Sequence, residues 1–301
     1  MIKRTLYFGN SGYLHLKNSQ LIWEPEPNEE MTPTIPIEDI GMLIIDNARI
    51  TITHGLMASL LANNCVVIHC DQKHMPAGIF VANEANTLYS QVVKAQLEAS
   101  IPITKNIWQQ IIKSKLKNQA EVLEFTGQSG SKIRQMISEV QSGDAMNIEG
   151  RAAAFYFGHL FGSENKFKRR RDGEPPNHLL NYGYAILRAI TARGIVGSGL
   201  LGVIGIHHRN KYNAWCLADD IMEPYRPWVD RLVIETCATM DEIPEELTPA
   251  LKKSVLSIPI LDVWIEGLRS PLMTAVNRTT SSLARVFQGE TRKLLLPTFS
   301  E

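Results

Sequence analysis

The hydrophobic pattern of this chain changes its period near residues 75–90, and that change constrains the fold more than any other feature. Before it, short apolar runs at 4–8, 13–17 and 20–24 are separated by turn residues, which predicts β-strands. After it, apolar residues recur at the three- and four-residue spacing of amphipathic helices. We therefore predict an α+β protein in which a small N-terminal β-domain precedes a larger, all-α-helical C-terminal domain.

The domain boundaries follow from the same pattern. We assign residues 1–80 to the β-rich domain, 81–90 to a linker and 91–301 to the helical domain, which suits a chain of 301 residues. Further strands are predicted at 41–46 and 65–69, with a short helix at 54–64 between them. Helices are predicted at 85–99, 103–125, 131–140, 145–161, 179–192, 219–240, 248–258 and 271–288.

Charge is distributed unevenly along the chain, although the formal net charge is zero. A dedicated nucleic-acid-binding protein is usually basic overall, so the total alone argues against one. Local clusters argue the other way, because a neutral total can hide a basic face. We predict a DNA-binding loop at the strongest cluster, and a second set of basic residues follows one helix. These are Lys166, Lys168, Arg169, Arg170 and Arg171, and then Lys105, Lys113, Lys115 and Lys117.

Cysteine usage and hydropathy indicate the compartment. The four cysteines form no CxxC pair, and a chain of this size does not depend on a disulfide framework, so reduced thiols are expected. The longest notable uncharged run, 194–206, is shorter than the roughly 20 residues of a membrane span. We predict a soluble, cytoplasmic protein that does not associate with membranes.

Five acidic and imidazole side chains form the most informative candidate site. Asp219, Asp220 and Glu223 lie at i,i+3 and i,i+4 spacing, so a helix would bring them to one face. Pro224 follows at once and Pro227 comes three residues later, which would kink the helix or confine it to its first turn. An ordinary acidic helix start explains the same spacing equally well. Glu149, which opens an apolar helix, and His208, after a glycine-rich run, are weak signals individually.

Taken together, these side chains suit a divalent metal ion. Two carboxylates and one imidazole favour Mg²⁺ or Mn²⁺, whereas zinc more often recruits cysteine. Such an ion polarises a phosphoryl oxygen and activates an attacking hydroxyl group. The basic cluster would then hold a polyanionic strand.

Two other patterns predict different sites. Residues 197–202 read GSGLLG, a formal GxGxxG with acidic residues about 20 positions later, but the segment before it has a helical pattern where a dinucleotide site needs a strand. His69, Cys70, Asp71 and His74 would suit zinc, yet their spacing matches no standard finger. A strand end followed by a polar turn explains that cluster more simply.

Several stretches, in this order, resemble the CRISPR-associated integrase family, the catalytic subunit of spacer acquisition. They are NIEGRAAAFYF at 147–157, FGSENKFKRRR at 161–171, PNHLLNYGYAIL at 176–187, GLLGVIGIHH at 199–208 and LADDIMEPYRPWVD at 217–230. The resemblance spans essentially the whole chain. It implies a catalytic metal site of Glu149, His208 and Glu223, with Asp220 as a possible supporting ligand. The family frame, counted from Gly199, selects His208 over His207.

The resemblance also implies partners and cofactors. Members of the family form homodimers, and two dimers bridge a dimer of a small companion subunit. Double-stranded DNA fragments and CRISPR repeat DNA are the implied substrates, with Mg²⁺ or Mn²⁺ as the cofactor. Compact length and the stretch VIHCDQKHMP at 67–76 resemble the type II branch, whose loci also encode a large RNA-guided nuclease as a further candidate partner.

The implied activity is metal-dependent integration and endonucleolytic cleavage of DNA. The 3′-hydroxyl of a foreign fragment would attack a phosphodiester of the repeat, and water would replace that hydroxyl in the hydrolytic reaction. Two other functions remain open on the residues alone: a stand-alone metal-dependent DNA nuclease and a non-catalytic DNA-binding scaffold. A nicotinamide-dependent enzyme is the least supported alternative, because the context of residues 197–202 does not fit it.

Overall fold

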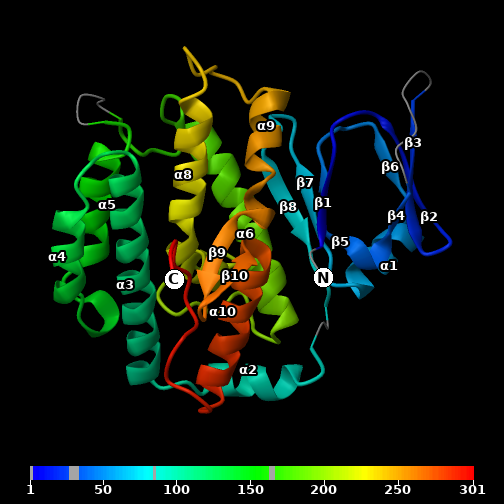
Figure 1. The fold of residues 1–301 in the computed structure, drawn as a ribbon. Helices are drawn as coiled ribbons and strands as arrows, with labels where there is room; N and C mark the ends of the chain where they lie inside the picture. Colours follow the sequence, from blue (N-terminus) through cyan, green and yellow to red (C-terminus); the bar gives the residue numbers. More distant parts are fainter. Residues whose placement is uncertain (1–2, 27–33, 84–85, 163–166) are drawn as a thin grey trace. The chain divides into compact units, whose positions relative to one another are not determined.

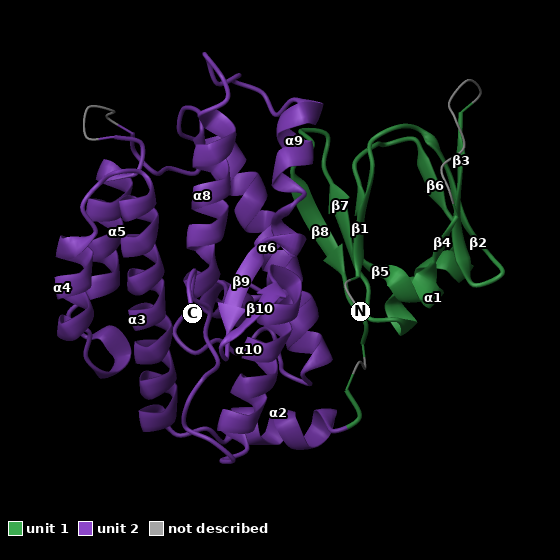
Figure 2. Cartoon of the chain, viewed as in Figure 1, with its two compact units in different colours: residues 1–87 green, residues 88–301 purple. Residues whose placement is uncertain are grey.

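The computed structural model describes residues 3–26, 34–83, 86–162 and 167–301. Its contacts divide the chain into two compact units, residues 1–87 and 88–301 (Figures 1 and 2). The first contains the β-sheets and the second is mainly helical, as the change of period predicts. Within the described residues, none of the helices is both long enough and apolar enough to cross a membrane.

Unit 1 contains two four-stranded sheets, with strand orders β1-β5-β7-β8 and β4-β3-β2-β6. All six residues of β5 are buried, as expected for a strand that lies between the parallel neighbours β1 and β7. Helix α1 begins at a Thr53 cap whose hydroxyl accepts the N–H of Leu56. The elements are β1 (Arg4–Phe8), β2 (Gly12–Lys17), β3 (Gln20–Pro25), β4 (Ile35–Pro36), η1 (Ile37–Asp39), β5 (Ile40–Ile45), β6 (Ile50–Ile52), α1 (His54–Ala62), β7 (Val66–Cys70) and β8 (Pro76–Phe80).

Unit 2 is built mainly of helices, whose bounds lie within a few residues of the predicted ones. The elements are α2 (Tyr89–Leu97), α3 (Ile101–Phe125), α4 (Ser131–Glu139), η2 (Ser142–Asp144), α5 (Ile148–His159), α6 (Asn177–Gly197), α7 (Cys216–Ile221), η3 (Glu223–Tyr225), α8 (Arg226–Cys237), α9 (Pro249–Val255), η4 (Ile258–Ile260), β9 (Asp262–Ile265), β10 (Leu268–Pro271) and α10 (Leu272–Phe287).

The prediction that this C-terminal part is entirely helical is wrong at one place. Strands β9 and β10 form an antiparallel hairpin. Their connection, Glu266 and Gly267, adopts positive φ angles of 54° and 69°, the conformation of a tight hairpin turn. Trp264 of β9 also pairs with Thr298 of the C-terminal segment.

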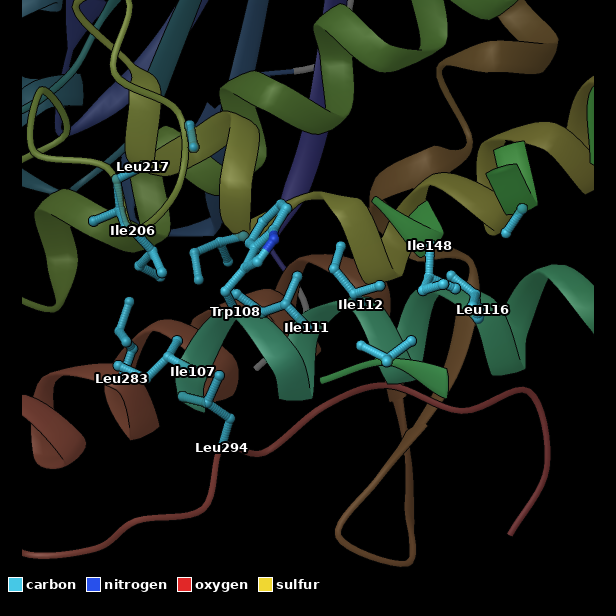
Figure 3. Packing of buried hydrophobic residues seen from close by; sticks show 14 of the residues in the cluster. Ile107, Trp108, Ile111, Ile112, Leu116, Ile148, Ile206, Leu217, Leu283 and Leu294 are labelled. Carbon is cyan, nitrogen blue, oxygen red and sulfur yellow. The ribbon is translucent and has the colours of Figure 1, made fainter. Parts of the chain in front are cut away.

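Helix α3 organises the core of unit 2. It runs for 25 residues, and its apolar face buries Ile107, Trp108, Ile111, Ile112 and Leu116 (Figure 3). This face packs against residues of α4, α5, α7 and α10. Burial of these side chains stabilises the packing of the neighbouring segments against α3. The long helix is therefore a rigid support for polar side chains that project from it.

Candidate metal centre

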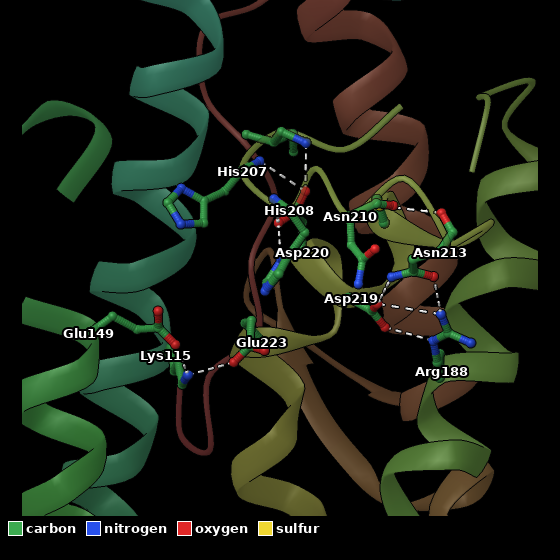
Figure 4. A network of polar contacts seen from close by, with 12 residues as sticks. Lys115, Glu149, Arg188, His207, His208, Asn210, Asn213, Asp219, Asp220 and Glu223 are labelled. Atoms are coloured by element: carbon green, nitrogen blue, oxygen red, sulfur yellow. Dashed lines mark hydrogen bonds and ion pairs between the residues drawn. The ribbon is translucent and has the colours of Figure 1, made fainter. Parts of the chain in front are cut away.

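Two glutamates from separate segments meet at one buried lysine. Lys115, on α3, places its Nζ atom 2.6 Å from Oε1 of Glu149 and 2.5 Å from Oε2 of Glu223 (Figure 4). The side chains of Lys115 and Glu223 are 7% and 5% exposed, whereas that of Glu149 is 27% exposed. The two carboxylates thus face a single cationic group, and Glu149 is the more exposed of the two.

The start of α5 fixes the position of Glu149. The carboxylate of Asp144 accepts the N–H groups of Ile148 and Glu149, both at 2.9 Å. The side chain of Asn147 caps the same helix by accepting the N–H of Gly150. Both acceptors satisfy backbone donors that the first helical turn leaves unpaired. The side chain of Glu149 therefore projects from a first turn whose backbone is held by two capping side chains.

Prolines determine where Glu223 points. Pro224 and Pro227 occupy early positions of η3 and α8, so the predicted helix at 219–240 is divided into α7, a 3-10 turn and α8. The side-chain amide of Asn118, from α3, donates to the carbonyl of Pro224 at 2.9 Å. Arg226 binds the other oxygen of Glu223, Oε1, at 2.8 Å. The turn is thus held on both sides of Glu223.

A buried aspartate shapes the loop that carries His208. Oδ2 of Asp220 accepts the N–H groups of Ile206 and His207 at 2.5 and 3.1 Å, and Oδ1 accepts the N–H of His208 at 3.1 Å. Nδ1 of His208 lies 2.6 Å from the same Oδ1. A Cβ at Gly205 would lie 2.3 Å from the His208 carbonyl oxygen, so the loop closes around Asp220 only with glycine there.

The two adjacent histidines point in different directions. The ring of His207 stacks on Trp108 of α3, with centroids 4.3 Å apart and planes 2° apart. The ring of His208 is hydrogen-bonded to Asp220 and lies close enough to Glu223 for each to shift the other's pKa (Figure 4). His208 is therefore the histidine that faces the carboxylates.

Asp219 does not join this group. Its carboxylate binds Arg188 of α6 at 2.6 Å and Asn213 at 2.5 Å. The i,i+4 spacing to Glu223 does not bring the two side chains to one face, because the helix is broken between them. Of the acidic residues grouped by sequence, Glu149 and Glu223 converge, Asp220 supports His208, and Asp219 holds α7 to α6.

Neighbouring charged groups shift the pKa values of Lys115, Glu223 and His208. Burial acts to lower the pKa of Lys115, but Glu223 and Glu149 together raise it, so the ammonium group stays charged. Burial acts in the opposite sense on Glu223, and Arg226 and Lys115 outweigh it and lower the pKa of that carboxyl group. The hydrogen bond to Asp220 raises the pKa of His208 against the effect of burial.

The two carboxylates and the imidazole of this site are ligand types that a hard divalent cation accepts. The Asp220 oxygen that meets Nδ1 of His208 already accepts a backbone N–H, so Nδ1 is the donor to it, and in the neutral imidazole Nε2 then carries the lone pair. Oε2 of Glu223 is buried and makes no hydrogen bond of good geometry, although it contacts Lys115 as an ion pair. Among the residues that the structure describes, no three His, Cys, Asp or Glu side chains are already spaced to hold a metal. The position between the Glu149 and Glu223 carboxylates is taken by the Lys115 ammonium group.

The basic cluster at 166–171 divides into anchored and exposed side chains. Arg169 is held by the side-chain oxygens of Asn177 and Asn181, at 3.0 and 2.7 Å, and lies over the ring of Tyr184. Its place is therefore structural. Lys168, Arg170 and Arg171 are exposed, and Lys166 lies outside the described residues.

The alternative sites do not form. The glycine-rich run 197–202 follows helix α6 and is not preceded by a strand, so the dinucleotide-binding context is absent from this described segment. In unit 1, Nδ1 of His74 binds the buried carboxylate of Asp46 at 2.8 Å. The described part of the chain offers no metal-holding group of three at His69, Cys70 and Asp71 either.

Sequence reasoning missed three residues of the centre: Lys115, Asp144 and Arg226. Lys115 carried the clearest signal, since it continues the four-residue spacing of Ile107 and Ile111 on the apolar face of α3. A charged residue at such a position is expected to be buried with partners of opposite charge.

Comparison with known proteins places the chain in one family. The family model "CRISPR associated protein Cas1" matches residues 6–257. The CRISPR-associated endonuclease Cas1 of Neisseria meningitidis serogroup C (strain 8013) is 35% identical over 300 residues, which cover 99% of this chain and 96% of that protein. Among solved structures, a casposase bound to integration product has a TM-score of 0.78 at 21% identity, covering 98% of this chain and 92% of the casposase. A Cas6-RT-Cas1–Cas2 complex has a TM-score of 0.74 at 20% identity, covering 97% of this chain and 36% of the other.

Proposed function

Because this chain belongs to the Cas1 family of CRISPR-associated proteins, we propose that it is a metal-dependent DNA integrase and endonuclease. In this proposal it inserts foreign DNA fragments as new spacers into a CRISPR array. One observation carries the proposal: Glu149 and Glu223 converge on a single cationic position, and His208 is held beside them by a buried aspartate.

We assign Glu149, His208 and Glu223 as the ligands of Mg²⁺ or Mn²⁺. Oxygen ligands are those that both ions prefer, and a single imidazole is compatible with Mn²⁺ in particular. The structure supports a positioning role for Asp220, because both of its oxygens already accept N–H groups and its side chain has no exposed surface. Asp220 orients the His208 ring, in the way that carboxylates orient metal-binding histidines in other proteins.

The reaction we assign is a transesterification. The 3′-oxygen of the incoming fragment forms a bond to phosphorus in the repeat, and the bond from that phosphorus to the neighbouring 3′-oxygen breaks. A bound Mg²⁺ or Mn²⁺ would stabilise negative charge on the phosphoryl and leaving oxygens. With water as the nucleophile, the same displacement is hydrolysis.

DNA contacts are assigned to exposed basic side chains of unit 2. Lys168, Arg170 and Arg171 lie in the exposed loop before α6. Lys105 and Arg209 line an open pocket of about 270 Å³ together with His207, the neighbour of His208. Lysine and arginine bind phosphate oxygens regardless of sequence, so these side chains would position a DNA backbone beside the metal centre.

The assembly we propose is a homodimer, two copies of which bridge a dimer of a small companion subunit. The Cas6-RT-Cas1–Cas2 complex supports a companion, because 97% of this chain matches part of one of its chains and its title names Cas2. The casposase supports an integration reaction, since its title names a bound integration product. We retain the type II branch, and with it the large RNA-guided nuclease as a further partner, as part of this proposal.

A half-site integration assay with repeat DNA and companion subunit tests the proposal. Glu149→Ala should abolish integration in both Mg²⁺ and Mn²⁺ while DNA binding persists, because a metal ligand is lost and the basic surface is not. Glu139→Ala is the matched control, since Glu139 is a half-exposed glutamate that pairs with Arg151 on the surface. That variant should integrate as the wild type does.

Other outcomes identify the alternative functions. Cleavage without the companion and without regard to repeat sequence would indicate a stand-alone nuclease. Activity that survives in EDTA, or in Glu149→Ala, would exclude the metal mechanism. A complete lack of catalysis by wild-type protein that still binds DNA would indicate a scaffold.

A further inference from the structure

The ammonium group of Lys115 occupies the position that the two carboxylates share. Nζ contacts one oxygen of Glu149 and one of Glu223, at 2.6 and 2.5 Å (Figure 4). A Mg²⁺ ion bound to the same oxygens would lie at about 2.0–2.1 Å from each. Because both distances are short, an ammonium group and a metal ion cannot occupy the space between these oxygens at the same time.

Arg226, the second cation beside Glu223, does not contact both glutamates as Lys115 does. It binds Oε1 of Glu223, whereas Lys115 binds Oε2, and its guanidinium group lies over the ring of Tyr184 at 4.5 Å. Arg226 thus neutralises one ligand from the outer side and has a second contact to hold it there. Lys115 alone bridges Glu149 and Glu223 among the contacts of the described residues.

We propose that Lys115 is a built-in counter-ion of the metal centre, which holds Glu149 and Glu223 together until a divalent ion displaces its ammonium group. This inference rests on the function proposed above. The flexible four-carbon stem of lysine allows the ammonium group to withdraw while it stays charged, which the planar, doubly held Arg226 does not permit. Lys115 is therefore a positioning residue, and it competes with the metal.

Two consequences follow from the competition. Without the lysine, two ligand carboxylates would repel each other near a buried position, so the metal-free protein is more stable with it. With the lysine, a metal must overcome a resident positive charge, so the free protein binds the ion weakly. DNA phosphate brings negative charge and further oxygen ligands, and metal binding should accordingly tighten when DNA is present.

Calorimetric titration of the full-length protein with Mn²⁺, in the absence of DNA, tests the competition. Lys115→Met removes the charge and keeps a stem of similar length. Its apparent Kd for Mn²⁺ should be about tenfold or more below that of the wild type, because a unit charge a few ångströms away changes ion binding by at least that factor. Lys117→Met is the matched control on the same helix, since Lys117 is exposed, and its Kd should equal that of the wild type.

A second readout is the melting temperature. In EDTA, Lys115→Met should melt below both the wild type and Lys117→Met, and saturating Mn²⁺ should raise its melting temperature more than theirs. Equal or weaker Mn²⁺ binding by Lys115→Met than by the wild type would overturn the counter-ion role and leave the metal assignment intact. Absence of binding in both proteins would overturn the metal assignment together with it.

A measurement on the wild type covers the case in which Lys115→Met does not fold. The side-chain NH₃⁺ group of a buried, ion-paired lysine gives its own ¹⁵N–¹H signal, which Lys115→Arg identifies by its loss. Addition of Mg²⁺ should shift or abolish that signal and leave the remaining lysine signals in place. A Lys115 signal that is unchanged at saturating Mg²⁺ would contradict displacement.

Discussion

At the scale of single residues, Asp220 determines the geometry of the loop that carries His208. Its two oxygens accept three backbone N–H groups and the imidazole Nδ1–H. Asparagine has only one acceptor oxygen, and its NH₂ group would face N–H donors that need an acceptor. The charge and both oxygens of this aspartate are therefore required for the loop to keep its shape.

Asp220→Asn should lower the free energy of unfolding by about 2–3 kcal/mol, the cost of leaving buried donors without an acceptor. It should also weaken metal binding about 10–100-fold, the usual effect of losing a carboxylate that orients a ligand histidine. Urea unfolding and Mn²⁺ titration measure the two effects. Asp219→Asn is the control: it disturbs the Arg188 pair and should leave Mn²⁺ affinity unchanged. Equal affinity in Asp220→Asn would show that His208 needs no such support.

The sequence alone predicts the acidic and imidazole members of the site, but not the cation between them. Glu149, His208 and Glu223 are found because spacing and family resemblance both select them. Lys115 is overlooked because a lysine between two other lysines in sequence suggests a solvated helix face. Only the four-residue spacing of Lys115 from Ile111, and of Ile111 from Ile107, indicates that Lys115 is buried. That spacing is weak evidence when the neighbouring lysines suggest an exposed face.

At the scale of elements, the segment from α7 to α8 shows what sequence does and does not determine. Pro224 and Pro227 predict an interrupted helix, and the structure has a 3-10 turn between two helices. The hairpin β9–β10 could not be predicted in the same way. Each strand has only four residues, too few for an alternating pattern, and it is the turn at Glu266 and Gly267 and the pairing of Trp264 with the C-terminal segment that define it.

Helix α8 also contains a buried carboxylate whose protonation should affect stability. Asp230 is 1% exposed and accepts hydrogen bonds from the hydroxyl groups of Tyr156 and Tyr184. Burial raises the pKa of Asp230 to about 6, against the effects of both tyrosines and of Arg226. An aspartate in an unfolded chain has a pKa of about 3.9. Between these values the folded state binds the proton more tightly, so stability falls as the pH rises through this window.

Asp230→Asn should remove this dependence, because the amide does not titrate. From pH 4 to pH 7, the stability of the wild type relative to the variant should fall by about 2 kcal/mol, which is most of the free energy that a pKa difference of roughly two units represents. Denaturant unfolding of both proteins at several pH values provides the comparison. A difference that stays constant over this range would mean that Asp230 is ionised in the folded protein throughout.

At the scale of the whole molecule, zero net charge coexists with an exposed basic loop. DNA affinity should therefore depend steeply on salt. Replacing Lys168, Arg170 and Arg171 by alanine should weaken binding and reduce the slope of log K against log salt by about 2–3, since each lost phosphate contact lowers it by about 0.9. Arg169 is left in place because Asn177 and Asn181 hold it as part of the loop. Binding measured from 50 to 300 mM salt should show unchanged slope if these residues do not contact phosphate.

In the mechanism proposed above, Glu149, Glu223 and His208 bind one divalent cation in place of the Lys115 ammonium group. Anomalous diffraction from crystals of the protein with Mn²⁺ and DNA tests it most directly. We expect a single Mn²⁺ peak in contact with both carboxylates and with Nε2 of His208, and Lys115 withdrawn from between the glutamates. A Mn²⁺ peak elsewhere in the chain, with Lys115 still bridging Glu149 and Glu223, would contradict this metal site.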